Sequence, residues 1–314
     1  MTEIPVISGR AVLDSIDPVT AMERTRHAFE RYAGAHWEMP AKVYLDSPPY
    51  GDFRAMPARG DGLALLKWVT SFPGNSAKGL PVVRGAVLLS DAETGKELAV
   101  IECSSVTSLR TGAAAAVSAQ VLALDEASTV GIIGCGVNGA WSARCLASAG
   151  YGPGVCADLR DERAHALADE LGWRVGERPE AAAEEVVVTV TPGNQPVILA
   201  SDLRPGQHIA VLGADAHGKQ EVELEAVQGC RLFCDEWDQA SAGGELANAS
   251  EAGVVIREDV GQLGDVLNGA PGRGSDEEIT LFDSTGLAIQ DLAICRAVHA
   301  RWRAGEIDAP VVTL

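Results

Sequence analysis

Short apolar runs recur between about residue 128 and residue 284, and segments rich in Ala, Leu, Glu and Arg separate most of them. The runs are continuously hydrophobic rather than alternating, which is typical of strands that are buried on both faces of a parallel sheet. Helix-like segments such as residues 161–171 and 221–228 lie between them. The pattern predicts a doubly wound α/β domain with a parallel sheet. The predicted strands are residues 129–134, 154–159, 185–190, 208–213, 231–236 and 279–284.

The chain up to about residue 110 has extended segments with more turn residues between them. Asp17 followed by Pro18 predicts the start of a helix, because aspartate caps a first turn and proline fits within it. Residues 104–124 and the tail, residues 286–305, predict two further helices, and we expect the tail to return to the N-terminal part. The predicted extended segments are residues 41–46, 52–58, 63–69, 85–91 and 97–103, with a hairpin connection at residues 90–97.

Composition and charge narrow the possible functions. With 46% hydrophobic and 22% charged residues, the chain has the composition of an ordinary globular protein. Its formal net charge of −19 would repel phosphate backbones and anionic membrane surfaces, so we expect no nucleic-acid or membrane partner. The first residues lack the features of a signal peptide, and no apolar run approaches the roughly 20 residues that cross a bilayer. We therefore expect a cytoplasmic protein.

The cysteines and histidines give no sign of a metal site. The chain has seven cysteines without a CxxC pair, and its six histidines form no HxxH or HxxxH arrangement. Several cysteines lie inside apolar runs, where a thiol packs as a small hydrophobic group. We expect reduced structural thiols and no bound metal.

A glycine-rich motif, "TVGIIGCGVNGAW" (residues 129–141), follows the first predicted strand. GxGxxG alone is weak evidence for a nucleotide site, but here a strand precedes it and a helix-forming segment follows it. The next strand ends in Asp158, which could accept hydrogen bonds from a ribose and would repel a 2′-phosphate. The motif therefore predicts an NAD site, although Arg160 could soften this preference and leaves NADP open. The cofactor-binding candidates within the motif are Gly134, Gly136, Val137, Asn138 and Gly139.

Three basic residues form a second group of candidates. Lys67 interrupts the apolar strand "LALLKWV", so its ammonium must leave the core or find an anionic partner. Arg110 lies in the first turns of the helix at residues 104–124, and Lys42 lies in the extended segment at residues 41–46. Each cation could instead be solvated or belong to a structural ion pair.

A third candidate, Asp215, directly follows the predicted strand at residues 208–213. Ligands bind at the carboxyl ends of strands in open α/β sheets, and a carboxylate there could move protons to or from an amine or imine. The alternative is that Asp215 only caps the turn that follows.

Three segments together resemble one family. The stretches "KWVTSFPGNSAKGLP" (67–81), "SLRTGAAAA" (108–116) and "LGADAHGKQE" (212–221) are similar to signatures of the ornithine cyclodeaminase/mu-crystallin family. The stretch "LFDSTGLAIQDL" (281–292) is similar to its C-terminal signature, and the motifs keep the family's order over about residues 40 to 300. The resemblance implies an NAD(P)-dependent enzyme that acts on an amino or imino acid.

The resemblance also implies a homodimer, formed through a split N-terminal domain, and an organisation into two domains. Residues 1–118 and 288–314 would form a discontinuous α+β domain for substrate binding and dimerisation. Residues 119–287 would form a Rossmann domain that binds the dinucleotide.

The resemblance implies roles for individual residues. Lys67 and Arg110 match positions that hold the substrate carboxylate, and Lys42 stands where many members have an arginine with the same role. Asp215 matches the carboxylate that exchanges a proton with the substrate nitrogen or the attacking water, so Asp215 and Lys67 are the candidate catalytic residues. Further cofactor contacts match Thr111 and, on the nicotinamide side, Thr191.

One departure from the family's pattern bears on the reaction. Cyclodeaminases carry a glutamate two residues before the Met-Pro of their "MP" motif, where this chain has Arg54 before the candidate substrate-binding residue Met56. A cation there would repel the distal ammonium of a diamine. "RAMPA" and "SFPGN" look instead like the branch that holds alanine dehydrogenases, imine reductases and dehydrogenases of amino-carboxyethyl amino acids.

These observations favour an NAD-dependent oxidoreductase with hydride transfer at the substrate Cα. Two alternatives stay open: a cyclodeaminase of the ornithine or lysine type that recycles bound NAD⁺, and a non-catalytic binding protein that uses the nucleotide only as a ligand.

Overall fold

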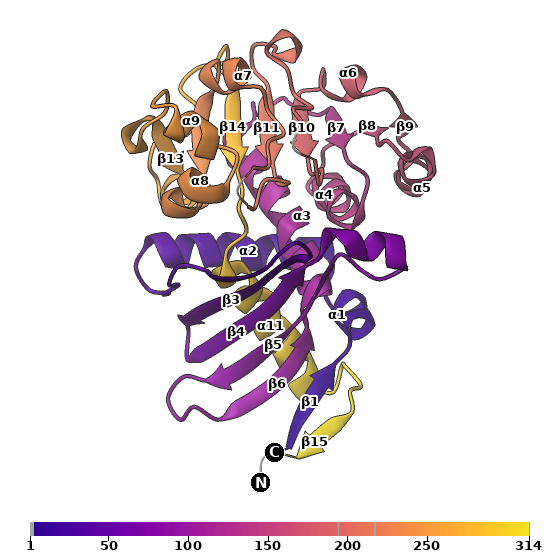
Figure 1. Cartoon of the computed structure of the whole chain (residues 1–314), viewed down its shortest axis with the longest axis vertical. Helices are drawn as coiled ribbons and strands as arrows, with labels where there is room; N and C mark the ends of the chain where they lie inside the picture. The colour runs from indigo at the N-terminus through magenta and orange to yellow at the C-terminus, as the bar shows by residue number, and fades with distance from the viewer. Residues whose placement is uncertain (1–2, 194, 217, 314) are drawn as a thin grey trace. The chain divides into compact units, whose positions relative to one another are not determined.

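The computed structural model describes residues 3–193, 195–216 and 218–313. The chain divides into two compact units (Figure 1). Unit 1 comprises Met1–Arg110 and Leu287–Leu314, and unit 2 comprises Thr111–Gly286. The division falls inside one long helix, α3 (Cys103–Leu122), and the predicted boundary after residue 118 lies in the same helix.

Unit 2 is built on an eight-stranded sheet with the order β13-β12-β14-β11-β10-β7-β8-β9. Every strand pair in it is parallel, and the predicted doubly wound α/β domain is therefore confirmed. Among its short, fully buried strands are the strand that leads into the glycine-rich motif, the strand that ends before Asp158, and the strands that precede Thr191 and Asp215. The sheet comprises β7 (Val130–Ile133), β8 (Gly154–Ala157), β9 (Arg174–Val175), β10 (Val186–Thr189), β11 (His208–Val211), β12 (Arg231–Cys234), β13 (Val260–Gln262) and β14 (Thr280–Asp283).

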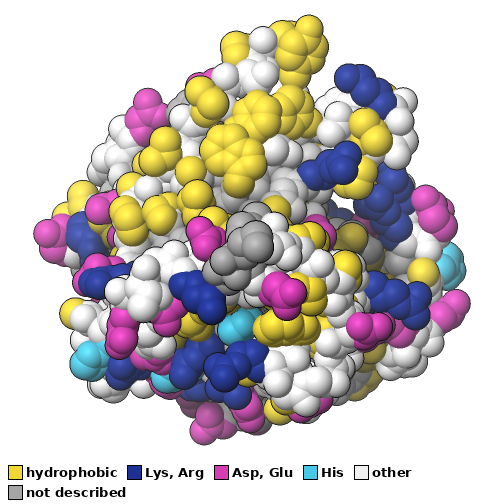
Figure 2. Space-filling view, turned by 90° about the horizontal axis from the view of Figure 1, so that it is seen from below, with side chains coloured by type: hydrophobic (Ala, Val, Ile, Leu, Met, Phe, Trp, Pro, Cys, Tyr) yellow, Lys and Arg dark blue, Asp and Glu magenta, His cyan; other side chains and the backbone are white. Residues whose placement is uncertain are grey.

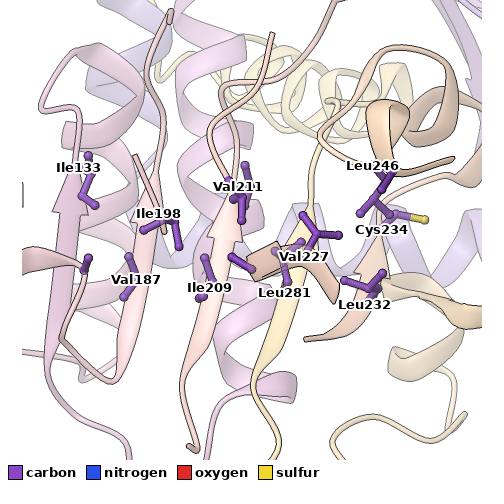
Figure 3. Close-up of a cluster of buried hydrophobic side chains, with 14 of the residues drawn as sticks. Ile133, Val187, Ile198, Ile209, Val211, Val227, Leu232, Cys234, Leu246 and Leu281 are labelled. Atoms are coloured by element: carbon purple, nitrogen blue, oxygen red, sulfur yellow. The ribbon is translucent and has the colours of Figure 1, made fainter. Parts of the chain in front are cut away.

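The core of unit 2 includes a cluster of buried hydrophobic side chains from the sheet and its helices, among them Ile133, Val187 and Ile209 (Figure 3). One predicted helix is shorter than expected. The segment 221–228 becomes helical only at Leu224, because Glu221 and Val222 form an extended bridge beside Ile198. The helices of unit 2 are α4 (Val137–Ser148), α5 (Asp161–Leu171), α6 (Arg178–Ala181), η2 (Ala200–Asp202), α7 (Leu224–Gln228), α8 (Trp237–Gly243), α9 (Ala247–Glu251), η3 (Arg257–Asp259) and α10 (Leu263–Leu267).

Unit 1 is built on a seven-stranded sheet with the order β15-β1-β6-β5-β4-β3-β2, in which β1 and β6 pair in parallel and the other neighbours are antiparallel. Its strands alternate between a buried and a more exposed face, as in half-buried antiparallel sheets. The strands are β1 (Glu3–Ile7), β2 (Val43–Ser47), β3 (Gly51–Gly60), β4 (Leu63–Ser71), β5 (Val83–Asp91), β6 (Glu97–Glu102) and β15 (Val311–Thr313).

Helices cover the buried face of this sheet. Helix α11 (Ala288–Arg303), formed by the predicted C-terminal tail, contacts β3, β4 and α2 (Pro18–Ala33). The predicted start of α2 is confirmed, since the Asp17 side chain accepts a hydrogen bond from the Thr20 amide at 2.7 Å. Helix α3 begins directly after β6, where the Glu102 carboxylate accepts from the amides of Ser104 and Ser105 at 2.7 and 2.9 Å. Two short helices complete the unit, α1 (Gly9–Ser15) and η1 (Pro73–Lys78). The return of the tail makes unit 1 a discontinuous α+β unit.

Candidate active site

Lys67 is buried on the inner face of β4, with only 1% of its surface exposed. Its ammonium group donates hydrogen bonds to Thr107 Oγ1 at 2.6 Å and to Asp291 Oδ1 at 2.9 Å. Thr107 lies in the first turns of α3, and Asp291 lies in the first turn of α11. An ammonium has three protons, so one remains available for a further acceptor.

Arg110 belongs to the same cluster. Its Nε lies 3.6 Å from Asp291 Oδ1, too far for a hydrogen bond, and the described residues offer this buried nitrogen no other partner. Lys67, Arg110 and Asp291 thus place two formal positive charges and one negative charge in a buried position. An unbalanced charge is costly away from water, so the cluster is suited to a small anion such as a carboxylate.

Met56 lies directly opposite Lys67 in the β3–β4 ladder and is buried on the same face of the sheet. Lys42 is half-buried and precedes Val43, which pairs with Ala55, the neighbour of Met56. The β2–β3–β4 ladder therefore brings the chain around Lys42 to Met56 and Lys67.

Arg54 is also buried on this face, but its charge is not left alone. Its Nε donates to Asp52 Oδ1 at 2.6 Å, and its guanidinium lies 5.3 Å from the centre of the Tyr44 ring. The sequence pattern did not indicate Asp52 as this partner. It reduces the repulsion that Arg54 would exert on a distal ammonium, and it fixes the guanidinium on the inner face of the sheet.

In unit 2 the glycine-rich turn has the geometry that a phosphate group requires. Gly134 adopts a φ of +97°, and a Cβ on Gly139 would meet the Gly134 oxygen at 1.9 Å, so both positions require glycine. Gly136 caps α4 without a side chain, which leaves the first-turn amides of Val137 and Asn138 free to bind an anion. A Cβ on Gly136 would come within 4 Å only of the Arg163 Nη1, at 3.7 Å. Backbone can therefore approach a pyrophosphate closely at this turn.

Asp158 lies at the carboxyl end of β8, beside the glycine-rich turn. Its two oxygens accept hydrogen bonds from the amides of Cys135 at 2.7 Å and of Arg160 at 2.8 Å. These bonds fix the carboxylate next to the turn and leave further lone pairs for a ribose. Arg160 itself is exposed, and the Leu159 and Val137 side chains are exposed apolar groups of the kind that a bound nucleotide could cover.

Thr111, the first residue of unit 2, lies in α3. Its hydroxyl is buried and has no hydrogen-bond partner within the described part of the chain. The next residue, Gly112, brings α3 close to α4, since a Cβ there would meet the Trp141 carbonyl carbon at 2.4 Å. An unpaired buried hydroxyl beside the helix that follows the glycine-rich turn fits a cofactor contact. These features together fit a dinucleotide on unit 2.

Asp215 and Thr191 lie in the loops that follow β11 and β10. Asp215 Oδ1 accepts a hydrogen bond from Lys219 Nζ at 2.5 Å. The Thr191 amide donates to Glu221 Oε1 at 2.5 Å. Asp215 therefore faces a cation.

Sequence reasoning missed several partners of the predicted residues: Thr107, Asp291, Asp52, Lys219 and Glu221. One signal could have indicated Asp291, because it is an acidic residue among the mostly apolar residues that the tail helix buries. All seven cysteines are free thiols. Within the ranges that the structure describes, no three His, Cys, Asp or Glu side chains are grouped to hold a metal ion, and no helix is long and apolar enough to cross a membrane.

The chain matches the model of the ornithine cyclodeaminase/mu-crystallin family over residues 8–306. The chain belongs to this family. It is 41% identical to an alanine dehydrogenase of Archaeoglobus fulgidus over 305 residues, which cover 95% of this chain and 94% of that protein.

Solved structures give the same result. An archaeal alanine dehydrogenase dimer with bound NAD superposes with a TM-score of 0.95 at 38% identity and covers both chains completely. The iminosuccinate reductase of Paracoccus denitrificans in complex with NAD⁺ superposes with a TM-score of 0.91 at 29% identity, again over both whole chains. The predicted family and the predicted class, an NAD-dependent oxidoreductase of amino or imino acids, are confirmed at this level.

Proposed function

We propose that the protein catalyses the NAD-dependent, reversible oxidative deamination of a small α-amino acid. In the forward direction the amino acid, NAD⁺ and water give a 2-oxo acid, ammonium, NADH and a proton. The observation that carries this proposal is the buried cluster of Lys67, Arg110 and Asp291, whose two cations exceed its one carboxylate. An amino acid supplies the missing anion as its carboxylate.

Lys67 and Arg110 act as a clamp on that carboxylate. The third proton of the Lys67 ammonium and the guanidinium of Arg110 donate to its two oxygens, while Thr107 and Asp291 hold the ammonium in place. A substrate fixed through its carboxylate presents its Cα–H in one orientation, and such positioning contributes several kcal/mol to a reaction's acceleration. Met56 supplies an apolar wall beside the clamp, and Lys42 adds a further cation.

Asp215 exchanges the proton. In the oxidative direction it accepts a proton from the substrate ammonium or from the attacking water, and in the reductive direction it returns a proton to nitrogen. Lys219, which donates to Asp215, favours the ionised carboxylate and so keeps it ready to act as a base.

NAD, held by the glycine-rich turn, Asp158, Thr111 and Thr191, supplies the acceptor and donor of the hydride when it is bound. The fixed carboxylate of Asp158 favours NAD over NADP, because a 2′-phosphate would meet a like charge there.

The likeness to a dimeric alanine dehydrogenase and the outer face of the unit 1 sheet both support a homodimer. On this face the rings of Phe53 and Trp68 stack at 5.6 Å, and Leu66 follows along β4. Figure 2 shows the molecule from below, and hydrophobic side chains, drawn in yellow, lie next to one another over part of this surface. Contiguous exposed apolar patches mark association surfaces. The exposed hydrophobic members of this face include Val43, Leu45, Leu66, Trp68 and Leu88.

The proposed function is tested by following NADH. We expect NADH to form when L-alanine or another small L-amino acid is added with NAD⁺, and to be consumed with the corresponding 2-oxo acid plus ammonium. Consumption of ornithine without net NADH would instead indicate redox-neutral cyclodeamination. NADH binding without turnover of 2-oxo acids, cyclic imines or amino acids would indicate a binding protein.

A further inference from the structure

Glu221 is a fully buried carboxylate that no proposed step uses. It lies near the end of the loop that follows β11, and its side chain reaches the start of the same loop and the loop that follows β10. Its Oε1 accepts from the Thr189 hydroxyl and from the Thr191 amide, both at 2.5 Å, and its Oε2 accepts from the Gly213 amide at 2.7 Å. One side chain thus fastens the ends of two neighbouring strands.

These loops carry residues with different assigned roles. The β10 loop holds Thr191, a cofactor contact, and the β11 loop holds Asp215, two residues after the fastened Gly213. Only glycine leaves room for this contact at position 213, because a Cβ on Gly213 would lie 2.4 Å from Glu221 Oε2 and 2.4 Å from the Thr191 carbonyl oxygen. Asp215 lies in a loop rather than in a helix or strand, so its position depends on how the backbone beside it is held.

Glu221 is itself held by a second carboxyl group. The amides of Glu221 and Val222 donate to Glu245, at 2.9 Å to Oε2 and 2.7 Å to Oε1 respectively. Burial raises the pKa of Glu245 to about 8 and also raises the pKa of Glu221, so Glu245 is largely protonated at neutral pH and the repulsion between the two groups is reduced. The arrangement has the form of a support: Glu245 fixes the backbone of Glu221, and the Glu221 side chain fixes the two loops.

We propose that Glu221 is a positioning residue that aligns Asp215 with the cofactor contact Thr191, an inference that rests on the proposed function. It makes no contact with substrate in this role. It acts through the Gly213 and Thr191 amides, which set the course of the two loops.

The Glu221→Gln variant tests the alignment because an amide has only one acceptor oxygen. If that oxygen stays with Thr191, the amide nitrogen must face the Gly213 N–H, and a buried donor then meets a donor. The β11 loop is released as a result. Glu245→Gln is the matched control, since one oxygen can still accept from both the Glu221 and Val222 amides and the group it replaces is already largely neutral.

We expect Glu221→Gln to lower kcat by about 10- to 100-fold with a near-constant KM for the amino acid, because small misplacements of catalytic groups have effects of this size. Glu245→Gln should stay within about threefold of wild type. Gly213→Ala, whose new Cβ would displace the same carboxylate, should reproduce the Glu221→Gln defect. If Glu221→Gln does not fold, Gly213→Ala provides the test.

Two readouts separate positioning from general destabilisation. In an Asp215→Asn background the Glu221→Gln change should lower kcat by less than about twofold, since residues that act as one unit are not additive. In the substrate-free protein, amide hydrogen exchange at the ends of β10 and β11 should be faster by about 10-fold or more in Glu221→Gln than in Glu245→Gln.

Additive effects in the double variant, or equal exchange in both single variants, would overturn the inference. Exchange needs no substrate, so it decides the role of Glu221 in fixing the loops even if the wild-type protein shows no amino-acid turnover. That latter result would contradict the proposed function alone.

Discussion

Lys67 Nζ donates to Asp291 Oδ1 at 2.9 Å although the two residues are 224 positions apart in the chain. Both side chains are almost completely buried, at 2% and 0% exposure. The contact ties the C-terminal helix α11 to strand β4 of the same unit. The residue proposed to clamp the substrate is therefore also part of what holds the C-terminal segment in the fold.

The Lys67–Asp291 pair should matter strongly for stability. Asp291→Ala leaves the Lys67 ammonium buried with the hydroxyl of Thr107 as its partner, and breaking a buried pair in this way costs about 3–5 kcal/mol. The measurement is the free energy of unfolding in urea. Glu38→Gln is the control, because its pair with Arg59 at 2.7 Å is exposed on both sides, and exposed pairs contribute about 0–1 kcal/mol. Equal losses of unfolding free energy in the two variants would mean that the buried pair contributes no more to stability than the exposed pair.

Arg110→Met tests the carboxylate clamp. Removing one partner of a desolvated, charge-assisted bond should raise KM and lower kcat/KM by an amount equivalent to about 2–4 kcal/mol. Affinity for NADH, measured by fluorescence titration, should change little. Near-normal kinetics in this variant would make Arg110 a structural residue.

Much of the fold could be predicted because the strands of unit 2 are buried on both faces. Their continuous hydrophobicity is a local property, and the predicted segment 208–213 contains the observed β11 (His208–Val211). Short edge strands carry a weaker signal: β9 (Arg174–Val175) has two exposed residues, and β15 (Val311–Thr313) is exposed throughout. Neither was predicted.

The candidate site was predictable as far as single residues show their chemistry. A lysine within an apolar strand signals that it needs an anion, but which anion it finds depends on a contact between distant segments. The Glu221 contacts were hidden for another reason. Residues 221–228 have the composition of a helix, and only the extended bridge of Val222 with Ile198 lets the carboxylate reach the two loops.

Asp158→Ala tests the basis of cofactor preference. The wild-type protein should prefer NADH to NADPH, because the carboxylate that the Cys135 and Arg160 amides hold would face a 2′-phosphate. The variant should lose affinity for NADH more than for NADPH. A wild-type preference for NADPH by about an order of magnitude would contradict the prediction and point to Arg160.

His208 should make the protein less stable at low pH. Its ring is completely buried between the hydroxyls of Ser118 and Thr280, at 3.0 and 2.9 Å, and burial lowers its pKa from 6.5 to about 3. Below pH 6.5 this histidine therefore binds a proton in the unfolded chain but not in the folded protein. The free energy of unfolding falls as the pH falls toward 3. The loss between pH 6 and pH 4.5 should be about 2 kcal/mol.

The comparison of variants isolates this contribution. The difference in unfolding free energy between wild type and His208→Gln should change by that amount over the same pH interval. A pH-independent difference for His208→Gln would show that the histidine is not buried in its neutral form.

Asp215→Asn separates a catalyst from a binding protein. The substitution keeps the shape of the side chain and a hydrogen-bond acceptor, but it removes the base. NADH and substrate should still bind, while turnover falls by about 10²–10⁴-fold, the range that general acid–base catalysis contributes. The limb of the kcat/KM profile that belongs to this carboxylate should disappear as well. Lys219→Met is the companion variant, because it removes the cation that donates to Asp215 at 2.5 Å. Loss of this cation favours the protonated carboxyl, so the same limb should move to higher pH without disappearing. An Asp215→Asn protein that turns over at the wild-type rate would leave Asp215 as a turn residue, and one that loses NADH binding together with activity would make it a support for the cofactor loop.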